Sequence, residues 1–256
     1  MPKIFVQGEV RAARGTRRDA AHTVEMGDAH GDAIACVLIC EGVGEPGFGC
    51  KVACDTMHEL VEWTENNASK IIKEADFELD YLRFIAGISA CIALVQMRWG
   101  EEDSGLPIHF AFLIAYKGEY LVVRVGEAKV LLMGADGCFE VGVDPTAEHI
   151  ALTQTALVIE PEPSMVSGTN YEFHIGEYKE GDLFLAMTPG IWDCLGEDGL
   201  ERAYADHKDL DEASLNELTA DLICETGKAG GSAGLSLAGV EMMSFTPYQT
   251  LGIKVS

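Results

Sequence analysis

The chain has 256 residues, of which 18 are basic and 42 acidic, so its formal net charge at pH 7 is −24. Hydrophobic residues make up 48% of the chain, enough for a substantial core, and this excludes a disordered protein. A surface this negative repels phosphate backbones and anionic lipid, so we expect neither nucleic acid nor membrane as a partner. No linker or repeat divides the sequence, and we expect a single domain over residues 1–256.

The N-terminus and the cysteines both indicate a cytoplasmic protein. No apolar segment follows the basic start, so no signal peptide is visible. The longest uncharged apolar stretch, residues 84–97, is shorter than the roughly 20 residues of a membrane-spanning helix, and we expect it in the core. The cysteines form no C-x-x-C pair and mostly lie among aliphatic residues, which is typical of buried reduced thiols. They are Cys36, Cys40, Cys50, Cys54, Cys91, Cys138, Cys194 and Cys224.

The first part of the chain predicts strands and then two helices. Extended segments are expected at residues 3–13, 22–26 and 33–40, and the last is continuously apolar, as in a buried strand. A Gly/Pro-rich stretch, residues 42–49, leads into a helix with Ala53, Met57, Leu60 and Val61 on one face. Asn67 is expected to cap a second helix, with an apolar face of Ile71, Ala75, Leu79 and Leu82.

After Gly87 the pattern favours strands. They are predicted at residues 92–98, 108–116, 120–125, 129–133, 139–143 and 182–187, with tight turns at Lys117-Gly118 and at residues 134–137. Two helices, residues 199–206 and 212–226, and a last strand, residues 250–255, complete the chain. Many antiparallel strands with helices inserted in two pairs predict two packed sheets covered by helices, an α+β fold.

Charge placement marks one candidate site. Four of the eight arginines, Arg11, Arg14, Arg17 and Arg18, lie within eight residues of an otherwise acidic chain. Planar guanidinium groups suit bidentate binding of phosphate or carboxylate. Pairing with surrounding acids is the other interpretation, since surface ion pairs are common. The sequence leaves both open.

Two strand-to-loop junctions and one histidine-rich segment are further candidates. Residues 40–44 and residues 188–193 carry glycines after predicted strands, either because a ligand approaches there or because the chain turns. His22, His30, Asp28 and Asp32 are close enough in sequence to hold a transition metal, but they lack metal-site spacing and we expect a solvated segment.

Five segments match, in chain order, the motifs of one known family. They are Arg14 with Asp19, residues 39–44, residues 125–130, residues 181–193 and residues 247–255. Together they resemble the metal-dependent protein phosphatase 2C (PPM) family over nearly the whole chain. The corresponding family motifs are Arg…Glu-Asp, Asp-Gly-His-Gly, Val-Gly-Asp-Ser-Arg-Ala, Ser-Asp-Gly-Leu/Ile-Trp-Asp and Asp-Asn-x-Thr.

The resemblance implies a four-layer αββα sandwich with a two-metal site at one end. There, carboxylates hold two Mg²⁺ or Mn²⁺ ions, and a metal-bound water attacks phosphoserine or phosphothreonine in line. Arg14 stands where the family's phosphate-binding arginine stands. The resemblance also implies that Asp19, Glu41, Pro189 and Pro247, although far apart in sequence, lie together.

The departures from the family pattern fall on the metal ligands. Pro189 and Pro247 stand where the family has aspartates, and proline has no side-chain ligand atom. Glu41 replaces the bridging aspartate, and Arg18 replaces the glutamate before Asp19. Of the carboxylates, Asp19 keeps its type, and Asp193 remains nearby. Because Mg²⁺ needs several oxygens in near-octahedral geometry, these residues predict that the ordinary dinuclear site is absent.

The sequence therefore supports three hypotheses. The leading one is a degenerate, catalytically inactive phosphatase that acts in signalling as a binding or regulatory module, without a cofactor and with a protein partner such as a phosphoprotein or a kinase. The alternative is an active Mn- or Mg-dependent serine/threonine phosphatase whose ions are held by Asp19, Glu41, Asp193 and a displaced acid. The third keeps only the arginine cluster, as a pocket for a phosphopeptide or a small anion.

Overall fold

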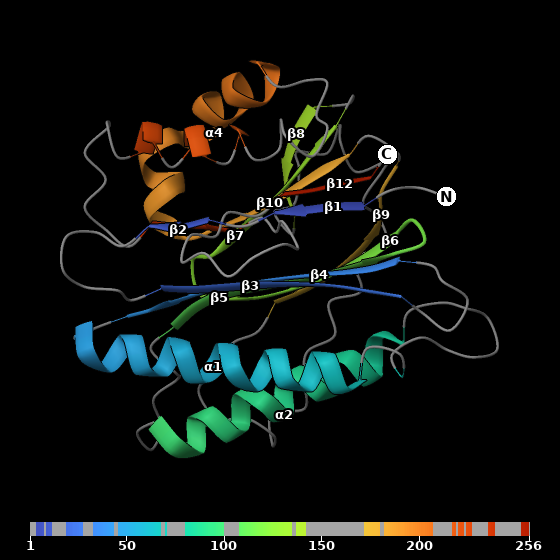
Figure 1. Cartoon of the computed structure of the whole chain (residues 1–256), viewed down its shortest axis with the longest axis vertical. Helices are drawn as coiled ribbons and strands as arrows, with labels where there is room; N and C mark the ends of the chain where they lie inside the picture. The colour runs from blue at the N-terminus through green and yellow to red at the C-terminus, as the bar shows by residue number, and fades with distance from the viewer. Residues whose placement is uncertain are drawn as a thin grey trace.

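In the computed structural model, two antiparallel sheets face each other between layers of helices (Figure 1). The structure describes residues 4–7, 9–11, 19–27, 33–43, 46–67, 70, 80–99, 108–134, 137–141, 172–179, 182–206, 217–218, 220–222, 224–226, 235–238 and 252–255.

One sheet has five strands in the described part of the chain, in the order β3-β4-β5-β6-β9. Their bounds are β3 (Asp19–Gly27), β4 (Ala33–Gly42), β5 (Ile108–Tyr116), β6 (Glu119–Val125) and β9 (Glu172–Glu177). The central strands β4 and β5 are buried on both faces, which explains their continuously apolar sequences. The predicted turn between β5 and β6 is confirmed: Lys117 and Gly118 both have positive φ, 48° and 87°, as a type I′ hairpin requires.

The other sheet is built around β10 (Leu183–Met187). One edge of β10 pairs with β7 (Lys129–Gly134), which in turn pairs with β8 (Gly137–Glu140). Along the opposite edge, the first three residues of β10 pair with β12 (Gly252–Val255), and its last two pair with β11 (Leu235–Ala238). The strands β1 (Ile4–Gln7) and β2 (Glu9–Arg11) extend this edge by pairing with β12 and β11. Both termini of the described chain thus lie in one sheet.

Helices cover the outer face of each sheet. Helices α1 (Pro46–Asn67) and α2 (Tyr81–Trp99) lie against the five-stranded sheet, and α4 (Pro189–Asp206) lies on the other (Figure 1). Three apolar clusters fill the spaces between these layers: one under α1 and α2, one between the sheets, and one under α4 that includes Leu218 and Leu222. This is the predicted α+β arrangement of two packed sheets with helices outside.

Helices α1 and α2 approach each other closely at Gly87. A Cβ at Gly87 would overlap the Trp63 ring of α1. The Trp63 ring meets Phe84 edge-on, with ring centroids 5.6 Å apart, and Phe84 stacks on Phe112 of β5 at 4.9 Å. Glycine at position 87 therefore allows one aromatic column to run from α1 through α2 into the sheet.

Polar contacts join the same two helices at the far end of α2. The Trp99 indole donates to Asp55 Oδ2 at 2.6 Å, and Arg98 pairs with Asp55 at 2.9 Å and with Glu59 at 3.0 Å. The hydrogen bonds from Trp99 and Arg98 hold the pKa of Asp55 below its ordinary value.

The predicted strand over residues 92–98 is wrong, because these residues belong to α2. The helix starts after Asp80, whose Oδ1 accepts from the Arg83 N–H at 3.1 Å, and it continues through Gly87. Gly87 indicated a break in the sequence, but its role is close packing. By length and composition α2 is the one helix among the described residues that could cross a bilayer, although one face of it is buried.

Other element bounds also differ from the prediction. Helix α1 begins at Pro46, inside the expected loop, and Asn67 is its last residue rather than the cap of a new helix. Helix α4 begins at Pro189, ten residues before the expected start, and bends at Gly196, where φ is 61°. Strands β9 and β11 were not predicted. Ile71, Ala75 and Leu79 lie outside the described residues, whereas Leu82 is exposed on α2.

None of the eight cysteines, all of which the structure describes, forms a disulfide, and they are not uniformly buried. Cys36, Cys40 and Cys91 are buried, while Cys54 and Cys224 are exposed. Burial raises the pKa of Cys91 to about 12. The reduced state of the thiols stays a prediction, and the prediction of burial holds for only part of the set.

We predict that Gly87→Ala destabilises the protein. The added methyl group meets the Trp63 ring, which is fixed by Phe84, so we expect a loss of about 1–3 kcal/mol in the free energy of unfolding. Gly47→Ala in α1 is the matched control, since nothing lies within 4 Å of its added Cβ, and alanine favours the helix. Urea denaturation measures both. Equal stability of the two variants would contradict the close-packing role of Gly87.

Candidate functional site

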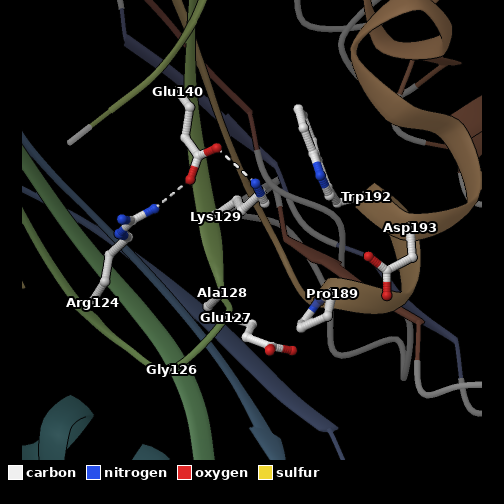
Figure 2. Close-up of a pocket in the computed structure, with 9 residues that line it drawn as sticks. All are labelled: Arg124, Gly126, Glu127, Ala128, Lys129, Glu140, Pro189, Trp192 and Asp193. Atoms are coloured by element: carbon white, nitrogen blue, oxygen red, sulfur yellow. Dashed lines mark hydrogen bonds and ion pairs between the residues drawn. The ribbon is translucent and has the colours of Figure 1, made fainter. Parts of the chain in front are cut away.

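A pocket of about 500 Å³ lies where the turn between β6 and β7 meets the start of α4 (Figure 2). Its walls combine two cations, three carboxylates and one indole, and the figure shows their side chains around a common space. The lining residues are Arg124, Gly126, Glu127, Ala128, Lys129, Glu140, Pro189, Trp192 and Asp193.

Arg124 connects the two sheets at this pocket. It is 7% exposed and stands on β6, directly across from Glu172 on β9. Its Nε donates to Glu172 at 3.1 Å, its Nη2 also pairs with Glu172, and its Nη1 donates to Glu140 on β8 at 2.7 Å. Burial alone would raise the pKa of Glu172, but the hydrogen bonds and charge of Arg124 lower it below its ordinary value. We call Arg124 together with Glu140 and Glu172 the Arg124 clamp.

Lys129 extends the clamp to α4. Its ammonium group lies 2.7 Å from Glu140 Oε2 and 4.0 Å from the centre of the Trp192 ring, the latter a cation–π contact. Each cation that lines the pocket therefore already has a carboxylate partner within the protein. The pocket is not a preformed site for a free anion.

His109 holds the turn between β6 and β7. Its Nδ1 accepts a hydrogen bond from the Glu127 N–H at 3.0 Å. Gly126 has φ 70° and lies so close to the His109 ring that a Cβ would overlap it, so glycine is required there for two reasons. Burial lowers the pKa of His109. The ring is consequently neutral at pH 7, with its proton on Nε2.

Asp19 and Glu41, two of the site residues predicted from the sequence, lie side by side at the end of the sheet near the pocket. Asp19 on β3 is the cross-strand partner of Glu41 on β4, and Glu41 is the partner of His109 on β5. Glu41 is buried. His109 then contacts the Glu127 backbone at the pocket wall. The end of the five-stranded sheet with Asp19 and Glu41 is thus the end that carries the pocket.

Pro189 and Asp193 lie in the first five residues of α4, the helix that follows β10 of the other sheet. Pro189 directly follows Thr188, the residue that separates β10 from the helix, and the Ile191 N–H donates to the Thr188 carbonyl at 3.1 Å. Proline suits the first helical position, because it needs no N–H donor there and its φ is already helical. In Figure 2, Glu127 and Asp193 lie on either side of Pro189. Asp193 is exposed.

The described residues fit a dinuclear Mg²⁺ or Mn²⁺ centre poorly. Pro189 contributes no ligand oxygen at the end of β10. Within the described ranges, no three histidine, cysteine, aspartate or glutamate side chains come together closely enough to hold an ion. Arg14, Arg17, Arg18 and Pro247 lie outside the described residues, as do Asp28, His30 and Asp32 of the histidine-rich segment. Their roles remain predictions.

The clamp residues were missed at the sequence level, although the sequence carries a signal for one of them. Arg124 interrupts the apolar run of β6, and a charge inside a buried strand needs a partner. Its partners, Glu140 and Glu172, are 16 and 48 positions away, so the sequence alone could not identify them.

Comparison with solved structures places this architecture among bacterial serine/threonine phosphatases. The S. agalactiae serine/threonine phosphatase is similar with a TM-score of 0.63 and 14% sequence identity, covering 99% of this chain and 98% of the other. Stp1 from Staphylococcus aureus gives 0.63 and 13%, covering 100% and 95%. PstP/Ppp from Mycobacterium tuberculosis gives 0.62 and 11%, covering 99% and 98%. The chain has the phosphatase 2C fold.

The likeness concerns the fold and not the chemistry of the site. No protein-family model matches the chain, and no curated protein matches it in sequence. Of the residues in the five motifs, Asp19, Glu41 and the start of α4 lie at one end of the sandwich, whereas Arg14 and Pro247 are outside the described residues. What that end does depends on this chain's own residues.

We predict that Arg124→Ala destabilises the protein, because it removes the hydrogen bonds of a buried guanidinium group to Glu140 and Glu172. Glu140 keeps Lys129 as a partner and Glu172 is half exposed, so the expected loss is about 1–3 kcal/mol in the free energy of unfolding, measured by urea denaturation. Arg98→Ala is the matched control. Arg98 also binds two carboxylates but is 48% exposed, and we expect almost no change. A small effect at Arg124 would mean that the clamp does not hold the sheets together.

We predict that His109 makes stability depend on pH. Its pKa is below 6.5 in the folded protein, so the unfolded chain takes up more protons as the pH falls through 6.5, and stability falls with it. His109→Asn retains an acceptor for the Glu127 N–H without a titrating group, so its stability should fall less between pH 7.5 and 5.5. His174, whose pKa is also lowered by burial and by Arg124, leaves a residual dependence. Identical pH profiles for the two proteins would contradict this prediction.

Proposed function

We propose that this protein is a phosphatase-2C-like binding or regulatory module that does not hydrolyse phosphate esters. The observation that carries the proposal is Pro189. It occupies the strand-to-helix junction at which the resembled family places a metal-binding aspartate, and here it serves as the first residue of α4. A residue that starts a helix well but offers no oxygen supports a structural rather than a catalytic use of the junction.

The neighbouring residues support the same proposal. Glu41 has a stem one methylene longer than the aspartate of the family motif, and Arg18 brings a cation next to Asp19 in sequence. Water activation by two divalent ions needs a dense set of carboxylates, which repel one another until the ions bind. The Arg124 clamp instead compensates its carboxylates with protein cations.

For the partner, we propose a protein. The cations of the pocket are paired with Glu140 and Glu172, so recognition of a phosphorylated segment would fall to Arg14, Arg17 and Arg18. A phosphoprotein or a kinase in the cytoplasm fits this proposal. The net charge of −24 disfavours a nucleic acid.

We predict that Mn²⁺ neither stabilises the protein nor activates it. An ion at a hundredfold excess over its dissociation constant would stabilise the folded state by roughly 2.7 kcal/mol, which a melting curve detects easily. We therefore expect no change in Tm with millimolar Mn²⁺ and no phosphate release from a phosphopeptide. An increase in Tm that EDTA reverses, with hydrolysis that Asp19→Ala abolishes, would replace this proposal with the active-phosphatase alternative.

We further predict that restoring the family's ligands restores Mn²⁺ binding. The variant combines Pro189→Asp, Pro247→Asp, Glu41→Asp and Arg18→Glu. Aspartate at position 189 is compatible with the fold, because a negative charge at a helix N-terminus is favourable. The matched control carries Asn at 189 and 247 and is otherwise identical. A rise in Tm with Mn²⁺ is expected for the Asp variant alone, and its absence in both would show that these positions do not form one site.

A further inference from the structure

Helix α2 lies on the outer side of its layer (Figure 1). It exposes several apolar side chains to solvent. Its large exposed apolar side chains are Leu82 at 67%, Leu94 at 51% and Met97 at 86%. Ala86 and Ala90 are exposed between them. The whole helix contains no acidic residue, although acids make up 42 of the 256 residues of the chain. Solvation alone does not explain such a face on so acidic a protein.

Four of the exposed residues form one ridge with a symmetric order. Leu82, Ala86, Ala90 and Leu94 are four residues apart and therefore follow a single i±4 row along the helix surface. Read from either end, the row is large, small, small, large. In an antiparallel pair of α2 helices, Leu82 would meet Leu94 of the second copy and Ala86 would meet Ala90. The alanines at the crossing would let the two helices approach closely.

Charge complementarity also favours a second copy. Arg83 lies on the exposed side of α2, and among the described residues its guanidinium group donates to the Lys70 carbonyl at 2.7 Å. At the other end of α2, on the flank next to α1, Asp55 and Glu59 surround the single cation Arg98. By the 100° step of the helix, Arg83 faces this same flank. A two-fold antiparallel arrangement therefore brings Arg83 level with the Asp55 and Glu59 of the second copy.

We propose that α2 is a self-association surface through which two copies of this chain form an antiparallel, two-fold symmetric dimer. An isologous interface requires that each patch be complementary to itself, and the ridge and the flanking charges both meet this condition. One pair of helices gives a small interface, below about 1,200 Å² in total, so association is expected in the micromolar range.

Sedimentation equilibrium of the full chain at about 0.15 M salt tests the proposal, because the net charges of the two copies are then screened beyond roughly 8 Å. We expect dimers at 200 µM or below. Ala90→Glu places a charge at the crossing and should weaken association at least tenfold (about 1.4 kcal/mol), with an unchanged melting curve since position 90 is exposed. Ala205→Glu, on the exposed side of α4, is the matched control and should leave association unchanged.

The charge arrangement has its own test. Arg83→Glu should weaken association by placing a carboxylate beside Asp55 and Glu59 of the second copy, whereas Arg202→Glu on α4, with the same change in charge, should not. A wild-type protein that remains monomeric overturns the proposal, as does a dimer indifferent to Ala90→Glu or one weakened equally by Arg202→Glu. Flotation of a monomeric wild type with phosphatidylcholine vesicles would overturn it in favour of a membrane surface.

Discussion

The geometry of the pocket depends on a single buried guanidinium group. Arg124 is the point at which β6 and β9 of one sheet are joined to β8 of the other by charge-assisted hydrogen bonds. Apolar contacts between the sheets are non-directional, so they hold the layers together without fixing the relative position of the strand ends. The five donors of an arginine, in a rigid plane, impose that position. Because Lys129 shares Glu140 and stacks on Trp192, the same network also sets the start of α4.

This arrangement holds one end of a phosphatase 2C fold together through charges that the protein itself supplies. Here, at the pocket, Arg124 and Lys129 balance Glu140 and Glu172. Pro189 contributes in the same sense, since it starts α4 by its backbone geometry alone. Internal ion pairs and the helix start thus fix the geometry of this end of the sandwich.

The sequence predicted most of the sheets, and for clear physical reasons. The apolar run of β4 and the Lys117-Gly118 turn report directly on burial and backbone conformation. Helix α2 was misread as part helix and part strand, because residues 92–98 carry apolar side chains on nearly every face and show no helical period. The missing period has a structural cause: the inner face packs on the sheet, and the outer face is apolar as well.

The sequence predicted only those site residues that belong to the family motifs. Asp19 and Glu41 were expected together, and the register of β3 and β4 pairs them directly. Arg124 and His109 were not expected, because each acts through a contact that is distant in sequence. Arg124 binds the Glu140 and Glu172 carboxylates. His109 accepts from the Glu127 N–H. A local pattern can show that a buried polar residue needs a partner, but only the sheet register decides which partner it meets. The pocket is therefore a product of topology.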